Sequence, residues 1–589
     1  MKNSSLILPL LAFSLGIQNS FAQAEKPNIL LIITDDQGYG DFGFTGNSQI
    51  ETPTLDSLAA VSAQFMDYYV SPVCAPTRAS LMTGRYSLRT GVRDTYNGGA
   101  IMSADEITIA EMLKKEDYRT GIFGKWHLGD NYPSRPKDQG FDESVIHLSG
   151  GMGQVGDFTT YFQGDRSYFD PVLWKNGRQE KYFGYCSDIF TDEAIKFAAQ
   201  TDEKPFFLYL SFNAPHTPLQ VPDKYLEPYK DVDPQLLLEA NNPHGLELTE
   251  KNKEDARRVY AMISNIDENL NRLFSSLRES GKLENTLIIF MTDNGPQQRR
   301  YVAGMRGRKG SVFRGGVRVP LLISHPVLVQ GNRKIDQTAA HIDIFPTLAD
   351  ILDLKTPTDR KLDGMSLLPY LRNENESKKD RVLFFYWTRK YPTLYQNIAL
   401  QRGTYRLIAD QDFDGDNSDF SFFDYHSNPS ELENLSFKNL QIIEDLKSRL
   451  DETYRELIHS ENILTPPYIH VGTIFENPSY LNRNDAGGDR GIWAQEDIFG
   501  KWDVKTEKGL YNVEFKFIKP VPAGGLVIME FGPYVFRKSV KEETDVVILE
   551  NVALHDYHGD LIPFYQCDGS RIFPFWVRMD RIDMPRPIR

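Results

Sequence analysis

The sequence predicts an α/β protein with one large sheet, then a small antiparallel sheet with a covering helix, and finally a β-rich part. Continuous apolar runs, typical of strands buried on both faces of a sheet, are separated by amphipathic helical segments. These runs occupy residues 27–34, 206–212 and 286–292. Short alternating runs between 382 and 425 precede a helical segment at 440–458. Beyond about 464, short runs broken by Gly, Pro and Asp show no helical period, which is typical of a β-sandwich.

Length and charge limit the classes of protein that fit. The chain has 589 residues, so two or three domains are expected. We predict a signal peptide at 1–24, a main α/β domain at 25–378, an α+β subdomain at 379–463 and an accessory β-rich domain at 464–589. The net charge of −15 argues against nonspecific nucleic-acid binding. An anionic substrate would therefore need a local cluster of basic residues.

The first 24 residues have the pattern of a secretory signal. Lys2 precedes an apolar run from Leu6 to Ile17, and small residues follow it up to Ala24. A membrane anchor, the less favoured alternative, would need a longer apolar span. No other membrane span is visible, so we expect a periplasmic or secreted protein.

The three cysteines, Cys74, Cys186 and Cys567, are too few for a disulfide scaffold. The sequence does not decide whether Cys186 and Cys567 pair.

The first apolar run ends on Asp35 and Asp36, followed by a glycine turn. Open α/β sheets bind ligands at the carboxyl ends of their strands, so these carboxylates are candidate ligands. For the dipeptide alone, a solvated Asp-Asp turn is the alternative.

The segment 71–91 combines a reactive side chain with an anion site. Cys74 is followed by Pro76 and Arg78, which predicts a thiol at the start of a helix and a guanidinium one turn further on. The free N–H groups of a helix start and the arginine fork both bind anions. For this pattern alone, a buried and unreactive cysteine is the alternative.

Three further strand ends carry polar side chains. Lys125 and His127 follow a strand at 119–124, and their spacing of two on an extended segment points them the same way. His216 follows the run at 206–212. Asp293 and Asn294, which follow 286–292, offer hard oxygen ligands that could complete a cage with the two earlier aspartates. Taken singly, a histidine beside a tryptophan is also typical of a structural residue, and Asp293-Asn294-Gly295 is also typical of a turn.

These segments resemble the type I sulfatases, a formylglycine-dependent family of the alkaline phosphatase superfamily. C-A-P-T-R at 74–78 with L-M-T-G-R at 81–85 is similar to the family signature. Other similar segments are N-I-L-L-I-I-T-D-D-Q-G-Y-G-D at 28–41, G-K-W-H-L-G at 124–129 and N-A-P-H-T-P-L at 213–219. The resemblance covers roughly residues 27–460 and implies an alkaline-phosphatase-like large mixed sheet between helices.

The resemblance also implies a chemistry: hydrolysis of sulfate monoesters by formylglycine made from Cys74, with one bound Ca²⁺. The implied metal ligands are Asp35, Asp36, Cys74, Asp293 and Asn294. The implied catalytic and sulfate-binding residues are Cys74, Arg78, Lys125, His127, His216 and Lys309, with His216 as the acid and His127 as the base. The implied partners are a sulfated saccharide and a formylglycine-generating or anaerobic sulfatase-maturating enzyme, without nucleic acid.

One position departs from the family pattern: Arg314 stands where an acidic residue is usual after Lys309. We expect it to add positive charge near the pocket. The aromatic-rich segment 150–185 is the predicted substrate-facing wall, unless its rings only pack together. The predicted signal peptide, the acidic composition, this aromatic-rich segment and the β-rich C-terminal part together resemble exported bacterial polysaccharide sulfatases. The substrate that this resemblance favours is a galactose-type glycan with a 4-O-sulfate. A phosphonate or phosphodiester hydrolase of the same superfamily and a catalytically inactive glycan-binding protein remain alternatives.

Overall fold

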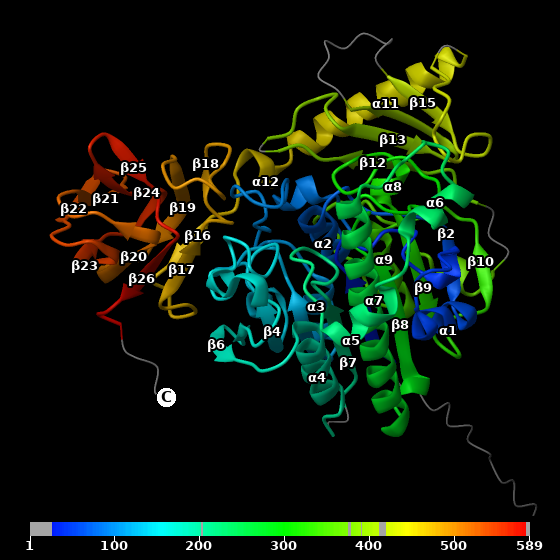
Figure 1. Cartoon of the computed structure of the whole chain (residues 1–589), viewed down its shortest axis with the longest axis horizontal. Helices are drawn as coiled ribbons and strands as arrows, with labels where there is room; N and C mark the ends of the chain where they lie inside the picture. Colours follow the sequence, from blue (N-terminus) through cyan, green and yellow to red (C-terminus); the bar gives the residue numbers. More distant parts are fainter. Residues whose placement is uncertain are drawn as a thin grey trace, which may run out of the picture.

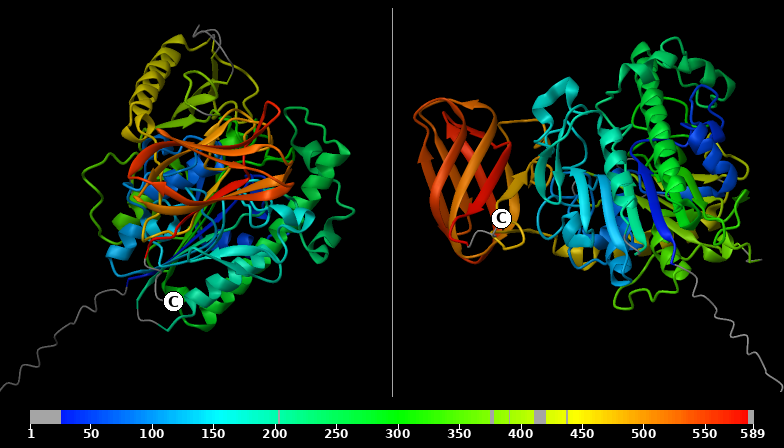
Figure 2. Two further views of the ribbon diagram at one scale, coloured as in Figure 1. Left: turned by 90° about the vertical axis from the view of Figure 1, so that its left-hand side faces the viewer. Right: turned by 90° about the horizontal axis from the view of Figure 1, so that it is seen from below.

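The computed structural model describes residues 26–201, 204–374, 378–389, 391–410, 420–436 and 438–584, so the predicted signal peptide lies outside the described residues. A large α/β body stands beside an all-β part, and a small sheet with one long helix covers another side of the body (Figure 1). The right-hand view of Figure 2 again shows the all-β part to one side of the helical body. The predicted fold class is confirmed.

The large sheet is mixed. Its strands are β1 Asn28–Thr34, β2 Ala63–Tyr69, β3 Arg119–Lys125, β4 Glu143–His147, β5 Val172–Lys175, β6 Arg178–Lys181, β7 Phe206–Ser211, β8 Thr286–Thr292, β9 Arg318–Ser324, β10 Arg333–Ile335 and β11 Ala339–Ala340. Among the described residues their order is β10-β2-β9-β8-β1-β7-β3-β4-β5-β6, with β11 beside β2. The central strands β8, β1, β7, β3 and β4 run parallel, so their carboxyl ends meet at one edge of the sheet.

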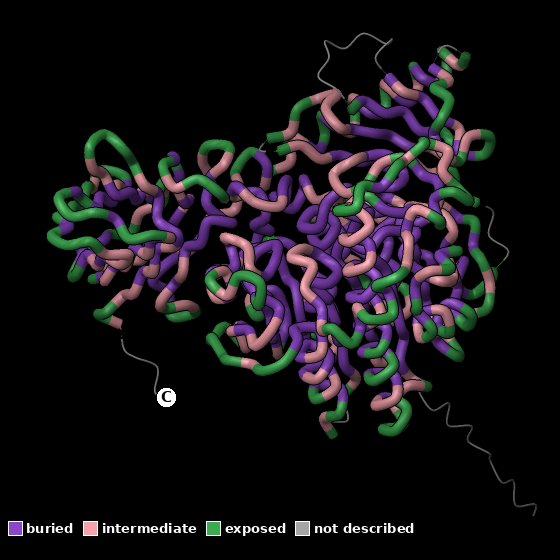
Figure 3. The backbone as a smooth tube through the Cα atoms, in the orientation of Figure 1, coloured by how far each residue is buried: buried purple, intermediate pink, exposed green. Residues whose placement is uncertain are grey.

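Helices cover both faces of this sheet. They include α1 Pro53–Val61, α2 Cys74–Thr83, α3 Ile109–Lys115, α4 Cys186–Ala198, α7 Glu250–Glu279 and α9 Ile344–Ile351. Ile29, Leu31 and Ile33 of β1 pack with α2, α3 and α9, whereas Leu30 and Ile32 pack with α1, α4 and α7. Successive side chains of a strand point to opposite faces, so an unbroken apolar run is what a strand covered on both sides requires. The buried backbone at the centre of the body is visible in Figure 3.

The segment 150–185 differs from the predicted irregular wall. Its β5 and β6 form a hairpin that extends the large sheet beyond β4. The four residues of β6 are exposed and polar, so no apolar alternation reveals the strand in the sequence. Tyr168 is fully buried, and Trp174 packs against Phe158 and Tyr480. Tyr168 therefore serves packing, and Trp174 joins the segment to the C-terminal part of the chain, whereas Phe162 is 59% exposed.

The small sheet is antiparallel, as predicted. Its strands are β12 Val382–Tyr386, β13 Ile398–Arg402, β14 Tyr405–Ala409 and β15 Ser421–Asp424, and the helix that covers it is α11 Leu440–Ile458. Leu446 and Leu450 of α11 pack with Leu400 and Leu407 of the sheet. The apolar positions of the predicted helix thus face the sheet.

Two sheets form the all-β part, which we call the C-terminal sandwich (residues 469–581). Its strands are β16 Ile469–Val471, β17 Ser479–Asn482, β18 Gly487–Gly488, β19 Gly500–Thr506, β20 Gly509–Val521, β21 Leu526–Phe531, β22 Tyr534–Ser539, β23 Thr544–Leu554, β24 Tyr557–Cys567, β25 Ser570–Ile572 and β26 Trp576–Arg581. Trp502 from one sheet and Phe515 and Val577 from the other share one core.

No helix in the described part of the chain has the length and apolar character needed to cross a membrane. Cys74, Cys186 and Cys567 are all free thiols, so Cys186 and Cys567 do not pair.

Candidate active site

Carboxylates gather where β1 and β8 end. Asp35 and Asp36 follow β1, and Asp293 and Asn294 follow β8, which pairs with β1 up to the last residue of each strand. The Asp36 amide donates to Asp293 Oδ1 at 3.1 Å, and Asn294 Nδ2 donates to Asp36 Oδ1 at 2.8 Å. All four side chains are completely buried. The structure therefore brings the four predicted oxygen ligands together.

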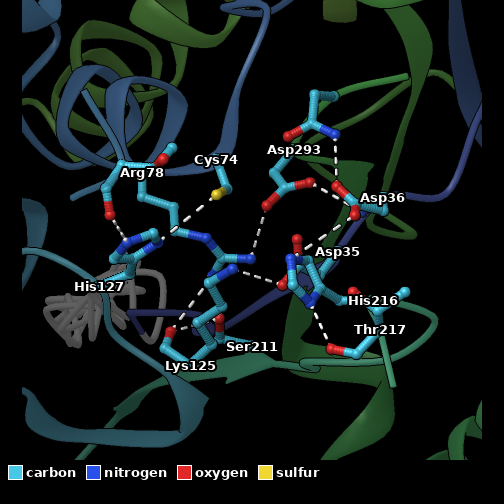
Figure 4. Close-up of polar contacts among 12 residues, drawn as sticks. Asp35, Asp36, Cys74, Arg78, Lys125, His127, Ser211, His216, Thr217 and Asp293 are labelled. Carbon is cyan, nitrogen blue, oxygen red and sulfur yellow. Dashed lines mark hydrogen bonds and ion pairs between the residues drawn. The ribbon is translucent and has the colours of Figure 1, made fainter. Parts of the chain in front are cut away.

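Each of the three carboxylates faces one cationic side chain. Figure 4 shows Arg78 and Lys125 beside Asp293 and Asp35. The pairs are Lys125 Nζ with Asp35 Oδ2 at 2.5 Å, Arg78 Nη2 with Asp293 Oδ2 at 2.8 Å, and Lys309 Nζ with Asp36 Oδ1 at 2.7 Å. Buried charges need partners of opposite sign, and each pair supplies one. Burial, followed by the charge of Asp35, raises the pKa of Asp293 to about 7.

Arg78 is fixed from several sides. It lies one turn into α2, and its Nη1 donates to Ser211 Oγ at 2.5 Å and to the Lys125 carbonyl at 3.2 Å. Burial disfavours the charged guanidinium, but Asp293 together with Tyr209, Asp35 and Cys74 outweighs burial and raises the pKa of Arg78 above its ordinary value. Arg78 therefore presents a permanent, immobile charge.

Cys74 and His127 face each other at the start of α2. Cys74 Sγ lies 3.5 Å from His127 Nδ1, and His127 Nε2 lies 2.7 Å from the Thr95 carbonyl. A carbonyl only accepts hydrogen bonds, so Nε2 carries the proton and Nδ1 of the neutral ring points its lone pair at residue 74. Burial, and then Lys125, lower the pKa of His127 well below its ordinary value, so the ring is neutral near pH 7.

His216 follows β7 and lies beside Asp36. Its Nδ1 donates to the Thr217 carbonyl at 2.7 Å, and its Nε2 lies 3.7 Å from Asp36 Oδ2. The Tyr168 hydroxyl donates to the His216 carbonyl at 2.7 Å and so fixes the backbone of this loop. Burial, followed by the charge of Lys309, lowers the pKa of His216 to about 3.

Lys309 and Arg314 point to different places. The Lys309 amide donates to the Pro296 carbonyl at 3.0 Å, which holds the loop beside the carboxylates. Arg314 starts the short helix α8 (Arg314–Val317), and its guanidinium contacts Asp67 and lies 4.3 Å from the centre of the Tyr425 ring. The expectation that Arg314 adds charge to the pocket is wrong, because this side chain is buried and ties the small sheet to the body.

The carboxylate cluster fits a hard divalent cation. Asp35 Oδ1 and Asn294 Oδ1 are buried and accept no hydrogen bond from the described residues. The ligand atoms of Asp35, Cys74 and Asp293 lie within 4.8 Å of one another. Carboxylate and amide oxygens are the ligands that Ca²⁺ and Mg²⁺ prefer. The site thus has orphaned acceptors of the right chemical type.

A buried set of acids and bases at the carboxyl edge of a large mixed sheet defines an alkaline-phosphatase-like hydrolase of anionic esters. The chain belongs to the sulfatase family, whose profile matches residues 27–354, and is by class a sulfuric ester hydrolase. A second profile, for the C-terminal part of N-sulphoglucosamine sulphohydrolase, matches residues 308–456.

Named relatives support this membership. Arylsulfatase A of Homo sapiens is 31% identical over 431 residues, which are 67% of this chain and 76% of that protein. Arylsulfatase J of Mus musculus is 30% identical over 357 residues, 59% of this chain and only 56% of that protein. The crystal structure of Ps i-CgsB in complex with k-i-k-neocarrahexaose superimposes with a TM-score of 0.63 at 28% identity and covers 74% of this chain and 94% of that one.

Sequence reasoning missed several residues of the site. Ser211 holds Arg78, which lies 133 positions away in the chain. The carbonyl of Thr95 sets the tautomer of His127, which lies 32 positions away. Ser211 does end a predicted strand, and that position is a signal which could have identified it. Thr95 acts through its backbone, so its side-chain type carries no signal.

Proposed function

We propose that this protein hydrolyses sulfate monoesters on a sulfated carbohydrate. One observation carries the proposal: three buried ion pairs gather around residue 74. Their carboxylates suit a divalent cation, and Arg78, Lys125 and Lys309 offer N–H donors to the oxygens of a sulfate. Fixed donors around an anionic ester stabilise the charge that develops when the S–O bond breaks.

As nucleophile we propose formylglycine made from Cys74. Burial raises the pKa of the Cys74 thiol, so the unmodified side chain is protonated and weakly nucleophilic. The hydrate of formylglycine supplies one hydroxyl that attacks sulfur and a second whose loss of a proton later expels sulfate. All residues of α2 are buried, so a formylglycine-generating or anaerobic sulfatase-maturating enzyme must reach this segment before it folds.

The two histidines have complementary roles in the proposal. Nδ1 of His127 faces residue 74 and, as the base, takes the proton whose loss expels sulfate. His216 protonates the departing alcohol oxygen from Nε2. Lys309 contributes to the low pKa of His216, so an anionic ester bound to Lys309 offsets that charge and raises the pKa of this imidazole.

We propose one Ca²⁺ as the metal, held by Asp35, Asp36, Asp293, Asn294 and residue 74. The support is the purely hard-oxygen character of the four side chains and the two orphaned acceptors among them. When bound, the ion would polarise the side chain of residue 74 and a sulfate oxygen.

The carbohydrate part of the proposal is supported by the rim beside Thr95, whose carbonyl contacts the candidate base. Arg389 Nη1 donates to Thr95 Oγ1 at 3.0 Å, and its guanidinium lies 4.7 Å from the ring centres of both Tyr96 and Trp387. The Tyr96 ring lies 5.5 Å from the ring of Trp493, which the C-terminal sandwich supplies. Half-buried rings beside an exposed guanidinium suit sugar rings that carry anionic groups.

We propose a galactose-type glycan and its 4-O-sulfate as the first substrate to test, because a structure 28% identical to this chain was solved with a neocarrahexaose. We also propose export to the periplasm or medium, on the basis of the apolar run near the N-terminus.

Parallel assays on an aryl sulfate and a phosphodiester test the reaction class. Faster cleavage of the sulfate is expected, and a clear preference for the phosphodiester would favour the phosphonate or phosphodiester hydrolase alternative. Mass spectrometry of the peptide that carries residue 74 tests the nucleophile. An unmodified thiol, in protein from a host able to modify it, together with no turnover would favour the glycan-binding alternative.

A further inference from the structure

A second groove lies between the large sheet and the C-terminal sandwich. Its volume is about 880 Å³, and none of the residues that surround Cys74 lines it. One wall comes from residues 135–137 and the β5–β6 hairpin, and the other from residues 473–480 and β26. A volume of this size accommodates a small oligosaccharide segment.

The two walls are joined firmly. Arg135 Nη1 pairs with Glu476 Oε1 at 3.1 Å, and Arg135 Nη2 donates to the Phe475 carbonyl at 3.1 Å. The Phe475 ring stacks on Tyr132 with a centroid distance of 4.9 Å and an interplanar angle of 19°. The groove is therefore preformed, and a ligand would not need to order its walls.

The charges of the groove are unbalanced in favour of cations. Five basic and two acidic side chains line it: Arg135, Lys137, Arg178, Arg578 and Arg581, with Glu476 and Asp580. The three arginines Arg135, Arg578 and Arg581 each have a carboxylate partner.

Two of these cations lack such a partner. Among the described residues, neither Lys137 nor Arg178 makes an ion pair, and Lys137 Nζ donates to the Phe475 carbonyl at 3.3 Å. Burial and then the charge of Arg135 lower the pKa of Lys137, and the carboxylates Asp138 and Glu476 offset them only in part. Cations that repel one another in a protein of net charge −15 mark a place where an anion is stabilised.

Apolar surface lies beside these cations. Ile474 is 80% exposed and Phe475 56% exposed, although both belong to the wall of the groove. Trp174 also lines the groove, and its Nε1 is buried without a hydrogen-bond partner among the described residues. Exposed apolar faces next to unpaired cations match a chain of sugar rings that carry sulfate groups.

We propose that this groove binds a segment of a sulfated polysaccharide, as an anchoring site separate from the pocket around Cys74. Sulfate groups contact Lys137 and Arg178, and the sugar rings lie against Phe475 and Ile474. The choice of glycan rests on the proposed function. A polysaccharide held here presents its other sulfated units to the active site at a raised local concentration.

The test measures binding in a Cys74→Ala background, which leaves the ligand intact. The probes are carrageenan as a sulfated galactan, its desulfated counterpart, and polyphosphate as an anion without sugar. Lys137→Ala/Arg178→Ala is compared with Arg537→Ala/Lys541→Ala, which removes the same charge from exposed, unpaired positions of the described sandwich. Each lost charge-assisted hydrogen bond is expected to weaken carrageenan binding about tenfold, so the first variant falls about 100-fold and the control stays near the parent.

Ile474→Ser should weaken binding of carrageenan but not of polyphosphate, because it changes only the apolar face. Equal losses in the two double variants would show nonspecific charge attraction and overturn the proposal. So would polyphosphate binding as tight as that of carrageenan, or binding of the desulfated chain as tight as that of the sulfated one.

In the background with Cys74 intact, Lys137→Ala/Arg178→Ala should leave cleavage of a small aryl sulfate unchanged and raise KM only for the polysaccharide. An equal loss on both substrates would contradict a separate site. A parent protein that cleaves no sulfate ester, yet binds carrageenan through the groove, would refute the proposed function and leave the groove site standing.

Discussion

Replacing Lys309 by alanine should remove most sulfatase activity while the fold persists. Lys309 Nζ lies 2.7 Å from Asp36 Oδ1, and the side chain is 16% exposed, so the charge acts where water screens it little. Removing one preorganised donor from such a site typically costs about 3–4 kcal/mol of transition-state stabilisation. That loss corresponds to a decrease of about 10²–10³ in kcat/KM. The backbone bond from Lys309 to Pro296 survives in the variant, so the loop should keep its place.

The assay is steady-state cleavage of an aryl sulfate, combined with a thermal melt of each variant. Arg308→Ala is the matched control, since the neighbouring Arg308 is exposed and its Nη1 contacts only the Gln297 carbonyl among the described residues. This control should keep parental kinetics. The assignment of Lys309 fails if Lys309→Ala stays within about threefold of the parent with an unchanged melting temperature. It also fails if Arg308→Ala loses as much activity.

Three further predictions concern the nucleophile, the metal and a buried acid pair. Cys74→Ala should abolish turnover without a large change in melting temperature, and measurable turnover would exclude residue 74 as the nucleophile. Activity lost to a chelator should return with Ca²⁺; recovery with Zn²⁺ alone would contradict the oxygen-ligand assignment. Burial raises the pKa of Asp485, which lies next to Asp130, to about 6. The folded protein therefore favours the protonated carboxyl more than the unfolded chain does, and the stability that this gives at low pH is lost as pH rises through about 6. Asp485→Asn should therefore raise the melting temperature at pH 8 more than at pH 4, and an equal change at both values would contradict this.

The carboxylates at the ends of β1 and β8 could be predicted from the sequence, because each directly follows an apolar run that marks the strand. β1 and β8 are unbroken apolar runs, and each is followed at once by its carboxylate. The parallel pairing of the two strands then brings Asp35 and Asp293 together without further information. The resemblance to sulfatases added the grouping of distant segments, which no single run of residues reveals.

Other features depend on contacts that leave no local signal. The β5–β6 hairpin is short and polar, so its strands have neither an apolar alternation nor a covered face. Arg314 reads as an extra cation near the pocket, but its partner Asp67 lies 247 positions away. The rim around Arg389 is assembled from three separate parts of the chain, and one of them belongs to the sandwich. Such sites become visible only when tertiary packing is known.

The three ion pairs also explain how an acidic protein keeps a cation site and an anion site in one buried pocket. Asp35, Asp36 and Asp293 cannot stay ionised in a dry interior without counter-charges, and each has a cationic side chain within hydrogen-bond distance. A divalent cation on the carboxylates would release the three side-chain cations from that role. A sulfate on those released cations would in turn relieve their repulsion by the metal. The metal would thus replace the side-chain cations beside the carboxylates, and the sulfate would replace the carboxylates beside those cations. The two should therefore bind with positive coupling, each raising the affinity of the other by the same factor.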